Sequence, residues 1–397
     1  MGYETPRMLN QLSVKKRLSL ILQTVCIALI TGIILSFNLW ISDRFYPLAS
    51  VFNFIPPLAS PFDSIAAILL ILLLLAIYYN FKSFFIYAAL TLLIMLLLQD
   101  QNRWQPWIYL YMLFLIPYLL FPVRKEIKGN LLPYFQLILI AVYIWSGIHK
   151  LHPNFINITF KSILADLFRI HNPETINSLK PFGYGVGIVE IIIGLTLLLP
   201  QSRKAGVWLA TCSHIFIILY LSPLGINHNY AVLPWNIEMI ILIFLCFYNT
   251  DSTRSFWPEG NPKFTILTTL AVILTWLLPA LNFIGLWDHY LSFALYSDKV
   301  NDYYIVVGES EIQKIDSRFR KYFKESDKVN GGEIIDVNAW SLGELNVPVY
   351  PESRVFKQIG MSFCNLNITE GQLFFLEFQP PAGLGNVNRF ICRDLNP

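Results

Sequence analysis

A lysine flanked by histidines ends one of the apolar stretches of this sequence. The segment YIWSGIHKLHPNF, residues 143–155, places Lys150 between His149 and His152. A lysine at the end of a membrane helix either extends its ammonium group to the lipid head groups or, when it is neutral, acts as a base. The segment alone leaves both interpretations open.

Metal binding is not expected at these histidines. His149 and His152 are three residues apart, but no carboxylate or third histidine follows at the spacing of a metal-binding helix such as H-E-x-x-H. Nucleotide-binding and serine-hydrolase motifs are also absent from the sequence. The glycines of GYGVG, residues 183–187, precede an apolar segment and therefore predict close packing between helices.

Three further ionisable residues, Glu190, His214 and Glu238, lie inside apolar segments. Such groups are costly in a membrane and are functional candidates by default. From the rise of a helix, each glutamate lies about 9 Å from the outer end of its segment and His214 near the middle. With Lys150 and Arg103, they predict one site that opens outward. The alternatives are interhelical hydrogen bonds for the glutamates and a structural role for His214.

The composition indicates a membrane protein, because only 14% of the residues are charged and 55% are hydrophobic, against about 25% charged in soluble domains. Nine apolar segments approach the roughly 20 residues that cross a bilayer. They are residues 18–41, 64–80, 83–99, 106–122, 132–149, 184–200, 205–222, 232–249 and 264–287. The predicted fold is an all-α polytopic membrane bundle, residues 1–297, followed by a small α+β domain, residues 298–397.

The C-terminal domain holds 25 charged residues, against 30 in the preceding 297 residues. DYYIVV (302–307) and GQLFFLEF (371–378) have the composition of strands, whereas EIQKIDSRFRKYF (311–323) and SRVFKQIGMSFC (353–364) have helical spacing. Cys364 and Cys392 can form a disulfide if this domain faces an oxidising compartment.

The distribution of lysine and arginine predicts the orientation of the chain. With the N-terminus inside, the inner loops hold twelve of these residues and the outer loops six, so the C-terminal domain is expected outside. In a bacterium the chain would occupy the cytoplasmic membrane. The net charge of +3 includes no long basic run, so we expect membrane lipid rather than nucleic acid as a partner.

Several segments resemble a known family. SGIHKLHPNF is similar to the G-x-K-K-L-D segment of the vitamin K-dependent γ-glutamyl carboxylases and their bacterial relatives, the horizontally transferred transmembrane (HTTM) domain proteins. LLLQDQNRWQPWIYLY, residues 96–111, resembles a turn of that family, and SHIFIILYLSPLG resembles its later histidine-bearing helix. The resemblance covers about residues 15–297. It implies that Lys150 is a base that deprotonates a reduced quinone and that His214 is its catalytic counterpart.

The resemblance also implies a cofactor site for a vitamin K-like hydroquinone. Trp145, Tyr230 and Trp235 would supply flat surfaces for the ring, and the remaining expected cofactor-binding residues are Arg103, Glu190 and Asn236. The family's Asn-Asn-His turn is replaced here by Arg103-Trp104-Gln105. The resemblance therefore implies quinol oxidation, coupled to modification of an unknown substrate, more than it implies protein carboxylation.

The alternative hypothesis is a non-catalytic membrane module or scaffold. In that case the membrane body binds lipid or a partner helix, and the C-terminal domain recruits an extracytoplasmic protein or peptide. The two hypotheses differ in what they expect of Lys150, Glu190, His214 and Glu238, which surround one cavity only under the first.

Overall fold

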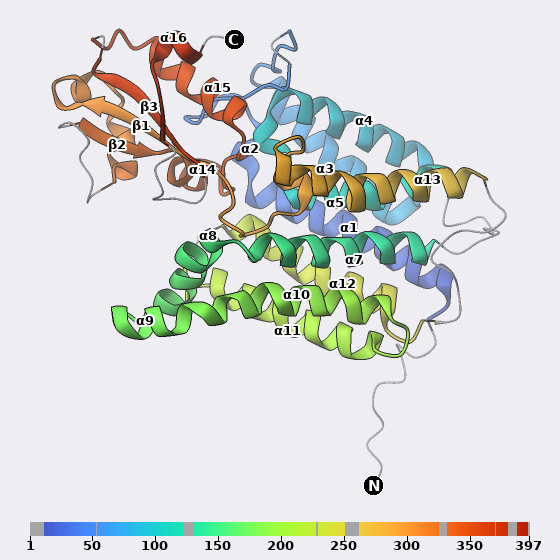
Figure 1. Cartoon of the computed structure of the whole chain (residues 1–397). Coiled ribbons are helices and arrows are strands. Elements are labelled where there is room, and N and C mark those ends of the chain that lie inside the picture. The colour runs from blue at the N-terminus through green and yellow to red at the C-terminus, as the bar shows by residue number, and fades with distance from the viewer. Residues whose placement is uncertain are drawn as a thin grey trace.

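A computed structural model describes residues 12–395 except 53, 122–130, 228, 251–261, 325–331, 370 and 380–386. Helices fill the first three quarters of the chain and a small sheet with short helices fills the rest, as Figure 1 shows. The long helices run roughly side by side in one bundle. The sheet lies at one end of the bundle, and the N-terminal end of the first helix lies at the other.

Uninterrupted apolar runs form the bundle helices, because only a helix satisfies every backbone group within a membrane segment. The helices are α1 (Val14–Leu35), α2 (Phe37–Trp40), α3 (Phe62–Asn80), α4 (Ser83–Gln99), α5 (Pro106–Leu115), α6 (Pro117–Leu120), α7 (Leu132–Lys150), α10 (Gly183–Leu198), α11 (Arg203–Leu221), α12 (Leu233–Phe247) and α13 (Pro262–Val272). Between α7 and α10 the chain forms α8 (Pro153–Phe155), two π-helical turns, Ile156–Phe160 and Ile163–Leu167, and α9 (Pro173–Leu179).

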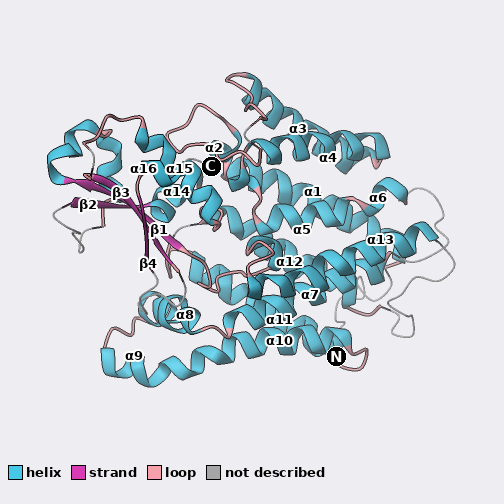
Figure 2. Cartoon of the chain, turned by 45° about the horizontal axis from the view of Figure 1, so that its top comes forward, coloured by secondary structure: helices cyan, strands magenta, loops and turns pink. Residues whose placement is uncertain are grey.

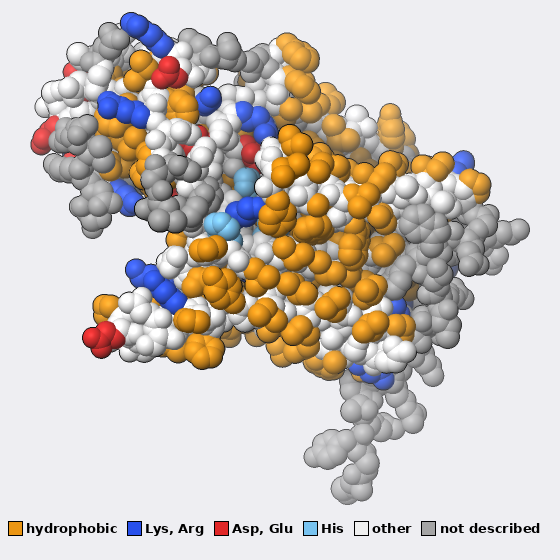
Figure 3. Space-filling view, in the orientation of Figure 1, with side chains coloured by type: hydrophobic (Ala, Val, Ile, Leu, Met, Phe, Trp, Pro, Cys, Tyr) orange, Lys and Arg blue, Asp and Glu red, His pale blue; other side chains and the backbone are white. Residues whose placement is uncertain are grey.

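All nine predicted apolar segments are helical in the described part of the chain. Seven helices there are long and apolar enough to cross a membrane, and Ser83–Gln99 and Pro106–Leu120 are apolar but shorter. Side chains such as Leu69, Leu72, Ile188 and Leu195 are exposed on the bundle. Figure 3 shows apolar side chains covering the side of the bundle that faces the viewer. Many of the charged side chains in this view lie on the C-terminal domain and the adjoining end of the bundle. The predicted polytopic membrane fold is confirmed.

Prolines interrupt two helices that the sequence predicted as continuous. Segment 106–122 is divided into α5 and α6 at Pro117. Segment 264–287 continues from α13 through a π-helical turn, Ile273–Leu277, into a 3₁₀ turn, Leu278–Ile284, that contains Pro279. A proline has no N–H for the helix ladder and its ring crowds the preceding turn, so a regular helix does not pass through it.

The C-terminal domain is built on a four-stranded antiparallel sheet in the order β2-β1-β3-β4. The strands are β1 (Asp302–Gly308), β2 (Gly332–Asp336), β3 (Leu373–Phe378) and β4 (Val387–Phe390). Helices α14 (Val337–Leu345), α15 (Ser353–Cys364) and α16 (Cys392–Leu395) accompany them, as Figure 2 shows. The predictions of strands at 302–307 and 371–378 and of a helix at 353–364 are confirmed.

The helix predicted over residues 311–323 is wrong. The chain forms two 3₁₀ turns there, Glu309–Lys314 and Ser317–Tyr322, separated by the extended residue Ile315. Asp316 accepts a hydrogen bond from the N–H of Arg318 and thereby starts the second turn afresh. A disulfide joins Cys364 to Cys392, so the pair that the sequence singled out is close enough to bond.

Candidate functional site

Two glycines bring α7 and α10 into backbone contact. A Cβ on Gly147 would lie 2.6 Å from the carbonyl oxygen of Gly187, and a Cβ on Gly187 would lie 2.7 Å from the carbonyl oxygen of Gly147. Only glycine tolerates such an approach. The close packing predicted from GYGVG is therefore confirmed, and it sets the distance between polar residues one turn further along each helix.

Lys150 and Glu190 form a buried ion pair across this contact. Lys150 Nζ lies 2.9 Å from Glu190 Oε2, and the side chains are 6% and 8% exposed. The same ammonium group donates a hydrogen bond of 2.7 Å to Ser146 Oγ, one turn earlier on α7. Lys150 thus points into the bundle and does not extend to the head groups.

A second hydrogen-bonded chain runs from α7 through α11 to α12. Tyr143 OH lies 2.6 Å from His214 Nε2, and His214 Nδ1 lies 2.9 Å from Asn236 Oδ1. Asn236 donates its own Nδ2 to the carbonyl of Val232, so its Oδ1 must accept. His214 Nδ1 therefore carries the proton, and Nε2 accepts from the Tyr143 hydroxyl.

The Lys150–Glu190 ion pair and the Tyr143–His214–Asn236 chain line one cavity of about 80 Å³. Its polar walls are Tyr143, Ser146, Lys150, Glu190, His214 and Asn236, with Trp235 and residues such as Val142, Val186 and Met239 forming apolar walls. A water molecule needs roughly 15 Å³ of such space, so the cavity holds several waters or a small polar group. Three of the four residues expected to share a cavity do so, together with the predicted residues Trp235 and Asn236.

Glu238 does not line this cavity. Its Oε1 accepts a hydrogen bond of 2.8 Å from Thr24 Oγ1, and its side chain is buried between α12 and α1. The alternative that the sequence left open, an interhelical hydrogen bond, describes this contact. Glu190 and Glu238 therefore have similar depth but face different neighbours.

Trp145 and Tyr230 also lie away from the cavity. The ring of Trp145 is 6.2 Å from that of His149 and 6.4 Å from that of Phe283, on a face of α7 that turns away from Lys150. Tyr230 donates its hydroxyl to Asn227, and its backbone N–H to Asn346 of the C-terminal domain. Neither ring is placed to stack on a molecule in the cavity.

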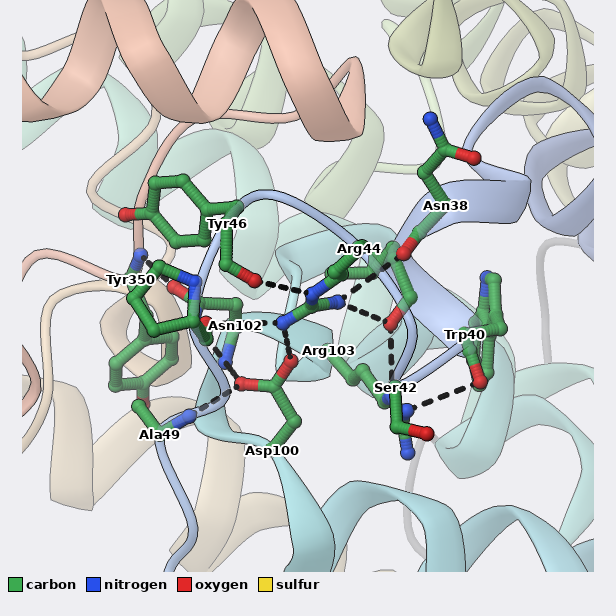
Figure 4. Close-up of polar contacts among 12 residues, drawn as sticks. Asn38, Trp40, Ser42, Arg44, Tyr46, Ala49, Asp100, Asn102, Arg103 and Tyr350 are labelled. Carbon is green, nitrogen blue, oxygen red and sulfur yellow. Dashed lines mark hydrogen bonds and ion pairs between the residues drawn. The ribbon is translucent and has the colours of Figure 1, made fainter. Parts of the chain in front are cut away.

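Arg103 belongs to a separate buried centre in the turn between α4 and α5, drawn in Figure 4. It donates to the carbonyl oxygens of Leu39, Trp40 and Leu96 at 2.9, 3.0 and 2.8 Å. Burial lowers the pKa of its guanidinium to about 10, which still leaves it charged at neutral pH. Arg103 does not line the cavity at Lys150 and Glu190.

Tyr143 is the site residue that the sequence reasoning missed. Three residues follow Tyr143 at helical spacing: Ser146, Gly147 and Lys150 lie three, four and seven positions after it. This spacing puts all four residues on one face of α7. That pattern was available as a signal.

His149, which precedes Lys150 in the sequence, is buried. Its side chain is 1% exposed, and its ring stacks on Phe283 with centroids 5.0 Å apart. No group of three metal-ligating side chains occurs among the described residues.

A family model, that of the methylamine utilisation protein MauE, matches residues 128–230. The match covers 103 of 397 residues, about a quarter of the chain. It includes α7, α10 and α11, and with them Tyr143, Lys150, Glu190 and His214. Searches of curated proteins and of solved structures give no match.

The resemblance to the γ-carboxylases and HTTM proteins is therefore wrong, because MauE is a different family of membrane proteins. The segment SGIHKL shares only a glycine, a lysine and a leucine with the carboxylase motif. In the structure, Gly147 serves helix packing and Lys150 an ion pair. Both needs arise in many membrane bundles, so these residues do not specify a family.

Proposed function

We propose that this membrane protein binds a lipid-soluble molecule with ring hydroxyl groups, of the reduced-quinone class, and accepts protons from those hydroxyls. One observation carries the proposal: two hydrogen-bonded groups that can take up a proton, Lys150–Glu190 and Tyr143–His214, line a single cavity with otherwise apolar walls. A few polar groups within apolar walls are typical of small-molecule sites.

The ion pair supplies the first proton acceptor. Lys150 is protonated when it faces a carboxylate, and it becomes a base only after one of its protons moves along the 2.9 Å contact to Glu190. The neutral amine can then accept a proton from a ring hydroxyl, and Glu190 keeps the proton it received. The pair as a whole gains one proton and acquires a positive charge.

The Tyr143–His214 contact supplies the second acceptor. Since Tyr143 donates its proton to Nε2, its oxygen is free to accept a hydrogen bond from a ligand hydroxyl. A proton then passes from ligand to tyrosine as the tyrosine proton passes to His214. Asn236 holds the imidazole in the required tautomer.

The size of the cavity limits what enters it. Its volume of about 80 Å³ is well below the roughly 300 Å³ or more that encloses an entire drug-sized ligand. We therefore place only the hydroxyl-bearing edge of the ring between α7 and α11, with the rest of the molecule outside the cavity.

Menadiol, a naphthohydroquinone without a lipid tail, tests this proposal on the full chain in nanodiscs. We expect tryptophan fluorescence quenching to report binding, since Trp235 lines the cavity. Tyr143→Phe should weaken binding about tenfold, because a single hydrogen bond of about 1.4 kcal/mol is lost. The double variant Lys150→Met/Glu190→Gln should weaken it further.

The matched control is Glu238→Gln, which alters a carboxylate at similar depth outside the cavity. Its dissociation constant should stay within about twofold of the unmodified chain, since no contact to the ligand is lost. Equal affinity for menadiol in all of these variants would overturn the proposal.

We place the C-terminal domain on the outer side of the membrane, as the loop charges predict. The Cys364–Cys392 bond supports this placement, because disulfides persist in oxidising compartments. A membrane-impermeant thiol reagent should label these cysteines in intact cells only after reduction. Labelling that requires cell lysis would reverse the orientation.

One observation favours the alternative, a scaffold with an extracytoplasmic partner. Strand β4 forms an edge of the sheet, and three of its four residues are exposed. An exposed edge can pair with an extended peptide. If Asn388→Pro abolishes the chain's cellular role while Lys150→Met/Glu190→Gln leaves it intact, the scaffold function replaces the first proposal.

A further inference from the structure

A second cavity of about 320 Å³ lies between the bundle and the C-terminal domain; we call it the interdomain chamber. Its walls include Trp107, Asn229 and Tyr296 from the bundle and Asp302, Tyr303 and Asp336 from the C-terminal domain. It shares Thr159, Tyr220, Trp235, Leu295 and Tyr296 with the smaller cavity. The volume suits a small molecule, and the shared wall places that molecule beside the proposed proton-transfer site.

The charged residues that line the chamber are all acidic. They are Asp298, Asp302 and Asp336, and no lysine, arginine or histidine belongs to the lining among the residues that the structure describes. Asp298 accepts from Thr159, and Asp336 accepts from the N–H of Ala339. The carboxylate of Asp302 has no hydrogen-bond partner in the described part of the chain. Lys324 acts on Asp302 electrostatically but does not line the chamber.

Unpaired polar atoms provide independent evidence for a ligand. Asn229 Oδ1 and Tyr303 OH have no hydrogen-bond partner, although their residues are only 5% and 3% exposed. Asn229 already uses its Nδ2 to donate to Tyr296 OH, so the free oxygen is an acceptor. Burying such groups without partners is costly unless a bound molecule completes them.

The arrangement favours an organic cation over a metal ion. The three aspartates do not converge, since no cluster of metal-ligating side chains occurs in the described ranges. Aromatic side chains form much of the wall, among them Trp107, Tyr290 and Tyr303, and ring faces attract ammonium groups. The unpaired acceptor Asn229 Oδ1 needs a hydrogen-bond donor, which a primary ammonium has and a quaternary one lacks.

We infer that the interdomain chamber binds a small primary amine in its protonated form, with Asp302 as the principal counter-ion. Asn229 Oδ1 accepts one of its remaining N–H groups. The amine reaches the chamber from the side of the membrane that holds the C-terminal domain. This site is separate from the cavity at Lys150 and requires no ligand there.

Isothermal titration of the full chain in nanodiscs with n-butylammonium chloride tests the inference at pH 7.5. We expect Asp302→Asn to weaken binding at least tenfold. Asp316→Asn, which removes the same charge from an exposed turn of the same domain, should leave binding unchanged. Asp302 has no hydrogen-bond partner to lose, so its asparagine variant should fold, and its elution on gel filtration verifies this.

Three probes separate a primary amine from other occupants. n-Butanol, which has the same carbon chain without charge, should bind at least tenfold more weakly than n-butylammonium, and so should tetramethylammonium, which has no N–H. Mg²⁺ should not compete. Equal binding of n-butanol, tighter binding of tetramethylammonium, competition by Mg²⁺ or an unaffected Asp302→Asn variant would each overturn the inference. Tyr143→Phe should leave butylammonium binding intact, which separates this test from that of menadiol.

Discussion

Two buried polar clusters lie at the end of the bundle that adjoins the C-terminal domain, and they use charge differently. In the first, which we call the clamp, Arg44, Asp100 and Arg103 direct most of their hydrogen bonds to backbone groups. None of the three lines the cavity at Lys150 or the interdomain chamber. In the second, the Lys150 cluster, Lys150 and His214 bond to other side chains around a cavity.

The hydrogen-bond partners in the two clusters explain why their roles differ. Backbone carbonyls do not take up protons, so the clamp only fixes chain segments in place. It joins the α1–α3 connection to the α4–α5 turn, and through Asn102 Oδ1, which accepts the N–H of Tyr350 at 3.1 Å, it anchors the C-terminal domain. The side chains around Lys150 can exchange protons with one another and with a ligand. Burial of a charge alone does not identify a functional site.

The largest expected effect is a loss of folding stability when the clamp is altered, which an alteration of the Lys150 cluster should not cause. Arg103→Met removes the Arg103 donor from the buried carbonyl oxygens of Leu39, Trp40 and Leu96. The carbonyl of Leu39 keeps its hydrogen bond from Arg44. Each lost hydrogen bond costs about 1–3 kcal/mol. We expect a loss of at least about 3 kcal/mol, seen as aggregation on gel filtration. Arg103→Lys should not rescue it, because an ammonium group cannot span the same three acceptors.

The control for that prediction is Lys150→Met/Glu190→Gln, which replaces a buried ion pair by neutral residues. Such replacements are often tolerated, so this variant should elute as a single folded species. If it aggregates while Arg103→Met does not, the assignment of a structural role to the clamp and a chemical role to the Lys150 cluster is reversed.

A somewhat smaller effect is expected at the helix contact that forms the Lys150 cluster. Gly187→Ala forces a methyl group to within 2.7 Å of the Gly147 carbonyl oxygen, so α7 and α10 must separate. We expect a cost of about 1–3 kcal/mol together with weaker menadiol binding. Gly185→Ala, where a Cβ meets nothing within 4 Å, should be neutral or stabilising. Equal melting temperatures for the two variants would contradict the role of the contact.

The depth of a side chain along its helix could be predicted from the sequence, whereas the neighbouring helix toward which it points could not. The apolar runs located the helices. The depths of Lys150, Glu190 and His214 predicted that they lie together, and all three line one cavity. Glu238 has similar depth but turns toward Thr24. A single sequence does not say which helix lies against which face, so Glu190 and Glu238 were indistinguishable.

Turns and short motifs were the weaker part of the sequence reasoning. The partners of Arg103 come from the carbonyls of residues 39, 40 and 96, and carbonyl positions leave no trace in side-chain patterns. Tyr143 was not among the expected site residues, and a tyrosine in a membrane helix is more often an interfacial anchor. Its spacing from Lys150 would have placed it on the same face.

We expect the melting temperature to depend moderately on pH, because of two aspartates in the interdomain chamber. Burial raises the pKa of Asp298 and of Asp302 to about 6, from 3.8. Because these folded-state pKa values are raised, the stability that protonation contributes is fully present below about pH 3.8 and is lost as the pH rises through about 6. The Tm at pH 5 should therefore exceed that at pH 7.5 by roughly 2–4 °C.

Asp302→Asn should flatten this dependence, since one of the two groups is removed, whereas Asp316→Asn should not. Butylammonium should raise the Tm at pH 7.5 more than at pH 5, because it pairs with the ionised carboxylates. A melting temperature that is unchanged between these pH values would contradict the raised pKa values of the chamber.

The smallest effect is expected at the rim of the clamp, where Arg354 offers a comparison with Arg103. Arg354 donates to Gln101 Oε1 at 2.7 Å and pairs with Asp288, but its side chain is 50% exposed. Water replaces such bonds when they are removed, so Arg354→Ala should cost no more than about 1 kcal/mol. Chemical denaturation of the two variants side by side measures the difference. If Arg354→Ala proves as damaging as Arg103→Met, then the number of hydrogen bonds that an arginine makes, rather than its own burial, determines what it contributes to stability.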